Sequence, residues 1–283
     1  MFPGKIQLAG TSAQVFALLV CLLSGSNSPA DNDEGSFGLN NFAFATYLGN
    51  GFYTTSGQNV FVLHLPFEHT IIEKTDTDAG WVLTLPMTVG FINFDGSLKD
   101  DIPGLNDVGT ITFLPGLQYQ YPVTPDWTLI PFADYGIARE LDSTSNVFVS
   151  GAGIKSYFNV HGENTMFTLG NRFLYAREHT QGSGNATDYS LIETGFNFRV
   201  ASRYKIADEQ LYTNFYYINF YYPDDLIFLE RTENPIRVGV ENEIGITFSN
   251  LPDFLFFEKP QAGFGIRMGN GVDVYRLVFG APF

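Results

Sequence analysis

Long runs in which apolar residues alternate with small or polar ones constrain this chain more than any other feature. Residues 166–178 are typical, and their two parities are Phe167, Leu169, Asn171, Phe173 and Tyr175 against Thr168, Gly170, Arg172 and Ala176. Successive side chains of a β-strand point to opposite faces of the sheet, so this period of two indicates strands with one apolar face. No long window repeats with the period of a helix, and we predict an all-β fold.

The length of the runs distinguishes a soluble sandwich from a barrel in a membrane. Strands of soluble sheets average ~5–6 residues, whereas a tilted strand needs ~9–11 residues to cross a bilayer. The runs here extend over about 10 to 13 residues, and their polar faces mix charges with glycine, which suits a narrow wet lumen. An open sheet edge is forbidden in lipid, so such strands must close on themselves. We predict a transmembrane antiparallel up-and-down β-barrel, with a soluble sandwich as the alternative.

Twelve candidate strands follow one another along the chain. They centre near residues 42–49, 59–69, 81–92, 109–122, 127–139, 147–158, 166–177, 188–200, 210–222, 235–248, 261–269 and 272–283. An even number places both ends of the barrel sheet on one side, as in single-chain bacterial barrels. Turns are expected near residues 75–78, 124–126, 161–164, 205–208 and 252–260, and external loops at 50–58, 95–107, 141–145, 179–187, 223–234 and 269–271. Proline removes a ladder donor, so we expect Pro66, Pro86, Pro115 and Pro131 at bulges or strand ends near the membrane rim.

Composition supports the barrel and excludes other classes. Charged residues make up only 16% of the chain, against roughly 25% in soluble domains. The longest apolar run, Val15–Leu23, is far shorter than the ~20 residues of a spanning helix. The net charge of −15 argues against nucleic acid as a partner, because binding it requires clustered Lys and Arg. Candidates for the interfacial aromatic girdles are Tyr119, Tyr121, Trp127, Tyr157, Phe158, Tyr216, Tyr217, Tyr221 and Tyr222.

The first thirty residues have the pattern of a secretory signal. Lys5 supplies the positive charge, Val15–Leu23 the apolar region, and small residues ending at Ala30 the cleavage site. Cys21 is the only cysteine and follows Val20 rather than a small residue, so we expect no lipidation and no disulfide in the mature chain. The predicted organisation is a signal peptide at 1–30, a short segment at 31–41 and a barrel at 42–283, exported through the periplasm to a Gram-negative outer membrane.

The last predicted strand carries a further indication. Counting back in twos from Phe283 gives Ala281, Phe279, Leu277 and Tyr275, all suited to lipid. A terminal aromatic on an alternating strand resembles the signal that the barrel assembly machinery recognises, so we predict that machinery as a partner.

Three internal segments extend this likeness to most of the mature chain. They are GWVLTLPMTVG at 80–90, LPGLQYQYPVTPDWTLIPFADYG at 114–136 and GAGIKSY at 151–157. Together they resemble the solitary outer-membrane autotransporter β-barrel family. The resemblance implies a twelve-stranded translocator-type barrel without a passenger, and it leaves the biochemical role open. Only about a dozen residues separate Ala30 from the first predicted strand, too few for a passenger or a long pore-threading helix.

Charges on the polar faces are expected to point into the lumen. They are Arg172, Glu193, Arg199, Arg237, Glu241, Glu243, Arg267 and Arg276. They could form a packed salt-bridge network that plugs the barrel, or a charged constriction that selects small solutes.

We find no catalytic, cofactor or metal site in the sequence. His179 and Ser183 are residue types used by outer-membrane phospholipases, but their order and spacing are wrong. The acidic segments 95–107 and 224–225 match no calcium loop. We expect a non-enzymatic structural or surface-interacting barrel whose partners are outer-membrane lipid and lipopolysaccharide. The alternatives are a porin-like channel for small solutes and a lipid-modifying enzyme, and the oligomeric state stays open.

Overall fold

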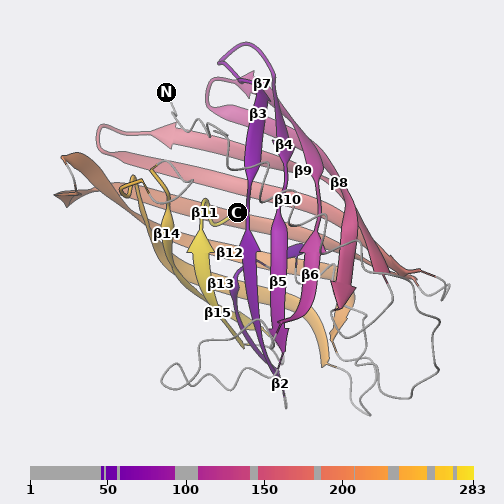
Figure 1. Cartoon of the computed structure of the whole chain (residues 1–283). Helices are drawn as coiled ribbons and strands as arrows, with labels where there is room; N and C mark the ends of the chain where they lie inside the picture. Colours follow the sequence, from indigo (N-terminus) through magenta and orange to yellow (C-terminus); the bar gives the residue numbers. More distant parts are fainter. Residues whose placement is uncertain are drawn as a thin grey trace.

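The chain folds into a closed antiparallel β-barrel (Figure 1). The computed structural model describes residues 46–47, 49–55, 58–92, 108–140, 146–181, 186–206, 208–228, 236–253, 259–269 and 273–283. Its strand segments are β1 (Gly51–Thr55), β2 (Gln58–Leu65), β3 (Glu68–Ile72), β4 (Gly80–Thr84), β5 (Met87–Ile92), β6 (Val108–Phe113), β7 (Gly116–Thr124), β8 (Trp127–Glu140), β9 (Asn146–His161), β10 (Thr165–Thr180), β11 (Ala186–Ile206), β12 (Glu209–Phe228), β13 (Ile236–Ser249), β14 (Ala262–Gly269) and β15 (Asp273–Phe279). The all-β prediction is confirmed.

From β8 to β15 each strand pairs with the next one in the sequence, and β1 closes the barrel by pairing with β15. Three wall strands are interrupted, so that β2 with β3, β4 with β5, and β6 with β7 each form one strand. Counted in this way, the described residues form a barrel of twelve strands, which is the predicted number although the first strand differs from the predicted one. In Figure 1, β5 and β6 cross the view almost at right angles to β10–β12 behind them, as in a barrel of tilted strands.

Prolines mark the three interruptions. Pro66, Pro86 and Pro115 lie in the middle of the merged strands, so their predicted place near the rim is wrong, whereas their place at strand ends is confirmed. The sheet remains connected across the gaps, because Leu114 N donates to Pro86 O at 3.2 Å and Tyr135 N donates to Pro115 O at 2.9 Å. Proline has no N–H to donate to the neighbouring strand, but its carbonyl still accepts a hydrogen bond. The carbonyls of Pro86 and Pro115 therefore bond to the next strand of the wall.

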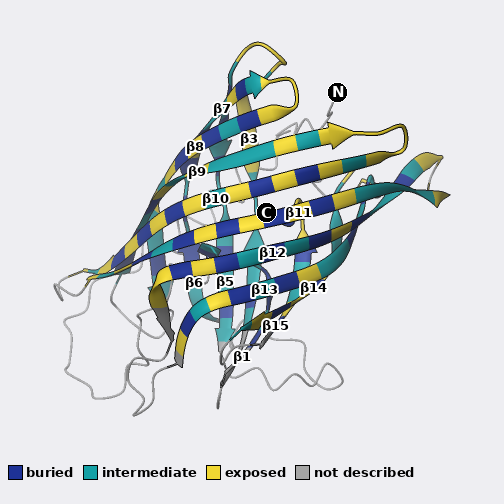
Figure 2. Cartoon of the chain, turned by 180° about the vertical axis from the view of Figure 1, so that it is seen from behind, coloured by how far each residue is buried: buried dark blue, intermediate teal, exposed yellow. Residues whose placement is uncertain are grey.

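Burial alternates along the long strands with the predicted parity (Figure 2). In β10, Thr168, Gly170, Leu174 and Ala176 are buried, whereas the side chains of the opposite parity are exposed on the outside of the wall. The aromatic candidates divide between the two faces. Tyr121, Trp127, Phe158 and Tyr221 are exposed. Tyr216 and Tyr222 are buried in the interior and Tyr157 lines the lumen cavity, so for these three the girdle prediction is wrong.

The two ends of the barrel differ. We call the end with the connections 73–79, 125–126, 162–164, 207–208 and 250–261 the turn end, and the opposite end the loop end. Most of the apolar interior cluster lies in the loop-end half, and Leu114 and Phe132 extend it to the middle of the barrel. Its members include Val62, Val147, Val149, Leu174, Ala176, Leu191, Tyr222 and Val238.

The first strand lies later than predicted. Residues 42–45 and 48 fall outside the described residues, and Thr46 and Tyr47 belong to no strand. The first strand is instead β1, which had been expected within an external loop. Its place is fixed by pairing on both sides, with Gly51 opposite Arg276 and Val62. The residues before it turn into the lumen, where Thr46 and Asn50 are buried.

The alternation towards Phe283 also breaks. Tyr275 and Phe279 are exposed on the outside and Leu277 is half-buried, but β15 ends at Phe279. Gly280 then adopts a φ of 85°, a left-handed conformation that L side chains rarely adopt. The turn directs the chain inward, and the Phe283 ring lies 6.2 Å from that of Tyr157. The prediction that Phe283 faces lipid is therefore wrong.

Candidate functional site in the barrel interior

Seven of the eight predicted lumen charges lie on the inward face of the wall. Six of them form ion pairs: Arg172, Glu193, Glu241, Glu243, Arg267 and Arg276. The seventh, Arg199, places its guanidinium 3.7 Å from the centre of the Tyr212 ring. The inward parity was thus predicted correctly for these residues.

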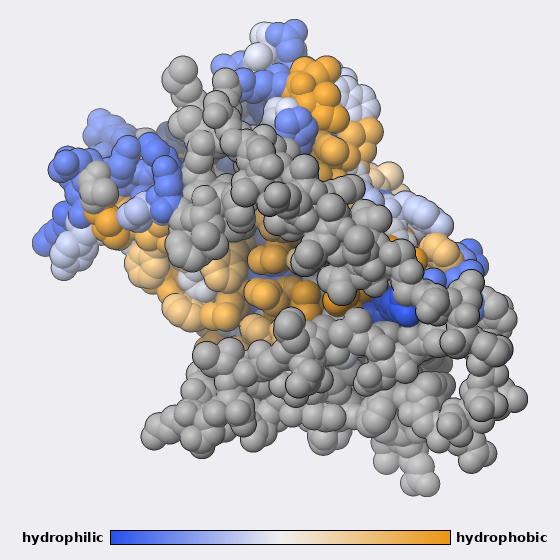
Figure 3. Space-filling model, in the orientation of Figure 1, coloured by the Kyte–Doolittle hydropathy of each residue, from blue (hydrophilic) through white to orange (hydrophobic). Residues whose placement is uncertain are grey.

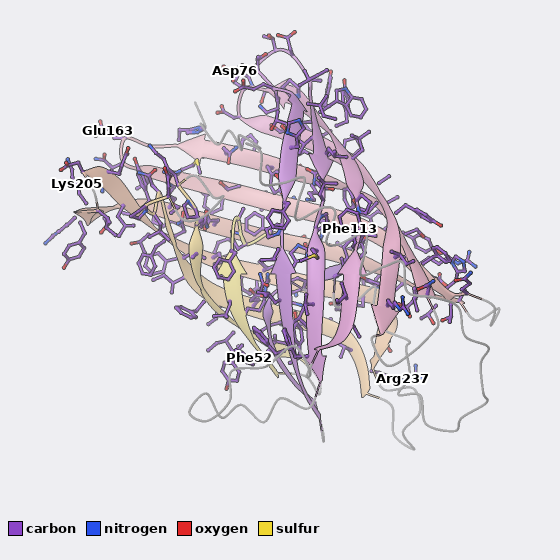
Figure 4. The ribbon with its side chains drawn as sticks, viewed as in Figure 1. Phe52, Asp76, Phe113, Glu163, Lys205 and Arg237 are labelled. Atoms are coloured by element: carbon purple, nitrogen blue, oxygen red, sulfur yellow. The ribbon has the colours of Figure 1, made fainter. Side chains whose placement is uncertain are left out.

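Arg237 is the exception. Its side chain is exposed, and Figure 4 places it at the loop end, pointing away from the barrel. The pairing of β12 with β13 shifts between Tyr221 and Leu226, and the shift puts Val238 inside with no exposed surface. The prediction failed because the alternation breaks within β13 beside this shift: Val238 is buried, whereas Val240 is exposed. In the sequence, this irregularity is marked by Pro223 and the two aspartates that follow it. The second of them, Asp225, has a φ of 45°.

Four charges at mid-height form what we call the central ion cluster: Glu241, Glu243, Arg267 and Arg276. Glu243 has the best geometry, because it accepts from Arg267 Nε at 2.9 Å and from Arg276 Nη1 at 2.9 and 3.0 Å. The Tyr216 hydroxyl also donates to Glu243, at 2.8 Å.

Glu241 is held more loosely. Its carboxylate lies 3.8 Å from Arg267 Nη1 and accepts from the Tyr222 hydroxyl at 3.2 Å. The face of Arg267 is covered by Phe220, at 3.8 Å from the ring centre. Two acids and two arginines therefore balance in charge within a site that water barely reaches.

A second row of charges crosses β9, β10 and β11. Lys155 stands opposite Arg172, and Arg172 stands opposite Glu193, with which it forms an ion pair. Like charges directly opposite each other on one face destabilise a sheet. Glu193 neutralises Arg172, so the row is left with one surplus cation, Lys155.

A cavity of about 900 Å³ occupies the turn-end half of the lumen. Most of its lining is apolar, and the polar side chains include Asp134, Lys155, Arg172 and Glu193. The cavity extends to Leu251 and Pro260 in the β13–β14 connection. Its size falls in the range of small-molecule pockets, roughly 300–1,000 Å³.

Sequence reasoning missed several lumen residues. Tyr47 donates to Asp134 Oδ2 at 3.1 Å, and His64 Nδ1 lies 2.9 Å from the Thr88 hydroxyl. Lys155 could have been placed inside from its parity with Tyr157 and Gly153, but nothing in the sequence gave the position of Tyr47, which precedes the first strand.

No second chemical site emerges from the described residues. His179 is exposed and stacks on Phe148 with 5.1 Å between ring centres, whereas Ser183 lies outside the described residues. No group of three potential metal ligands comes together in the described part of the chain, and none of its helices is long and apolar enough to span a membrane. At the turn end, an exposed hydrogen bond from Lys259 to Glu209 lowers the pKa of that carboxyl from its ordinary value.

Comparison with known proteins adds no family. No family model, no curated protein and no solved structure matches the chain. The barrel and its interior are therefore the basis for the function proposed below.

Proposed function

We propose that this chain is an integral outer-membrane β-barrel of Gram-negative type with an autotransporter-like fold and no passenger. Its role is structural or surface-interacting rather than enzymatic, and its surroundings are lipid and lipopolysaccharide. Assembly through the last strand relies on Tyr275 and Phe279, which point outward, and not on Phe283.

One observation carries the proposal: the polarity of the wall is inverted relative to a soluble protein. Charges are buried inside, whereas large apolar side chains cover the outside with exposed fractions between 38% and 64%. We call the following outward residues the apolar belt: Ile154, Phe158, Val160, Phe167, Leu169, Phe173, Tyr175, Ile192, Phe196, Phe198, Phe215, Tyr221, Val240, Ile244, Phe264, Ile266, Met268, Tyr275 and Phe279.

The belt is continuous over neighbouring strands. Figure 3 displays apolar side chains in the middle of the wall near β14 and β15, and hydrophilic ones at its projecting ends. Soluble monomers rarely expose apolar patches of more than a few hundred Å². In a membrane, lipid chains would cover such an apolar surface. A closed barrel also leaves no strand edge unpaired in lipid.

Membrane insertion is tested with the purified chain refolded from urea in the presence of phosphatidylcholine vesicles. We expect the chain to float with the vesicles in a density gradient and to migrate faster on a gel when it is not heated. A folded chain that stays in detergent-free buffer and does not float would contradict the proposal and favour a soluble barrel.

The channel alternative predicts a different electrical behaviour. The apolar cluster and the central ion cluster occupy the loop-end half and the middle of the lumen, so we expect the folded barrel to be silent in a planar bilayer. Heat-modifiable mobility of the same sample is the control for folding. Discrete and reproducible openings would favour the small-solute channel instead.

A further inference from the structure

We propose that the turn-end cavity binds an amphipathic monoanion, a carboxylate with an apolar body, whose head group pairs with Lys155. This inference goes beyond the membrane role and does not depend on it, because the cavity lies inside the closed wall.

The head-group site follows from the position of Lys155, which lines the cavity without an ion-pair partner. Within the described part of the chain, Lys155 has no ion-pair or hydrogen-bond partner, and its Nζ lies 5.4 Å from the centre of the Phe132 ring. Three acids share the cavity lining with Lys155, and none of them forms an ion pair with it. Glu193 is paired with Arg172, Asp134 accepts from the Tyr47 hydroxyl, and Glu68 is exposed in β3. A half-buried cation without a counter-ion stabilises an anion that enters the cavity.

The tail site follows from the remaining lining. Apolar side chains line much of the cavity, among them Leu65, Leu114, Ile130, Phe132, Leu251 and Pro260, and the last two belong to the turn end. A small hydrophilic anion would leave these surfaces in contact with water. An apolar body covers them, and each additional buried methylene strengthens binding.

Entry from the turn end is consistent with this polarity. The cavity reaches the β13–β14 connection at Leu251, Pro252 and Gln261, whereas the loop-end half is packed with the apolar cluster. The ligand therefore enters from one side, with its head group towards the middle of the barrel and its tail towards the turn end.

The test uses the full chain in phosphatidylcholine nanodiscs, with empty nanodiscs as the reference. Dodecanoate displaces the fluorescent probe 11-(dansylamino)undecanoate, and dodecanol serves as the uncharged comparison. We expect saturable binding of dodecanoate that is weakened about tenfold or more in Lys155→Met and retained in Lys155→Arg, because a hydrogen-bonded ion pair is lost only in the first variant. Lys205→Met is the matched control, because Lys205 lies at the projecting tip of the β11–β12 hairpin (Figure 4).

Binding no greater than that of empty nanodiscs, or equal affinity in the wild type and Lys155→Met, would overturn the proposal. A measurement without variants removes any dependence on folding of the mutants. Dodecanoate should protect Lys155 of the wild-type chain from an amine-reactive label, read by peptide mass spectrometry, and should leave Lys205 labelling unchanged. Equal labelling of Lys155 with and without dodecanoate would also refute it. If the chain does not insert into lipid, both assays are run in buffer, so failure of the membrane proposal is distinguished from failure of this one.

Discussion

Replacing Glu243 with alanine is expected to lower the free energy of unfolding by about 3–5 kcal/mol, because it leaves buried charges without their partner. Glu243 holds both Arg267 and Arg276 at 2.9 Å and has no exposed side-chain surface. The loss of stability therefore comes chiefly from two buried guanidinium groups that no longer have a carboxylate partner, rather than from the side-chain volume removed. The measurement is urea unfolding of the barrel from lipid vesicles, followed by tryptophan fluorescence, with the temperature of the gel-mobility transition as a second readout.

Two further variants test whether the geometry ranks the acids correctly. Glu241→Ala should also lower the stability, but by less, because Glu241 lies 3.8 Å from Arg267 and does not contact Arg276. Glu209→Ala should leave the transition unchanged, since its ion pair with Lys259 is exposed at the turn end. An unchanged transition in Glu243→Ala, or a larger loss in Glu241→Ala, would contradict the central ion cluster as the structure describes it.

The pattern of the long strands could be predicted from the sequence because each strand buries one parity of its side chains. The inward positions of Arg172, Glu193 and Glu243 follow from that parity alone. Their pairing does not follow, because it depends on the register between strands, which the alternation leaves free in steps of two. The surplus charge of Lys155 was missed for this reason, since it becomes visible only when Arg172 is known to stand opposite.

The remaining failures have local backbone causes. Arg237 points outward because the alternation breaks within β13 between Val238 and Val240, beside the bulge in β12. Phe283 turns inward because Gly280 leaves the extended conformation. The first strand was misplaced because residues 42–49 alternate as well as 51–55 do, and only closure against β15 selects between them. A periodic pattern predicts which face a residue takes within an unbroken strand, but it does not predict where the strand begins, bulges or ends.

Placing an arginine in the middle of the apolar belt should have the second large effect. Phe173 lies at the centre of β10, opposite Ile154 and Ile192, and 46% of its surface is exposed. A charge on the lipid face near the bilayer midplane destabilises a barrel by about 2–4 kcal/mol, and we expect this loss for Phe173→Arg in the vesicle unfolding assay.

The sign and size of this effect separate the two environments that the outer face could have. In water, an exposed phenylalanine replaced by arginine changes stability by only about 0.5 kcal/mol in either direction and improves solubility. Tyr204→Arg is the matched control, because Tyr204 is 74% exposed but belongs to the projecting end of β11, beyond the belt. A large loss in Phe173→Arg with none in Tyr204→Arg requires that the belt be covered by lipid. Equal and small effects at both positions would mean that water covers the belt, and the inverted polarity of the wall would then need another partner.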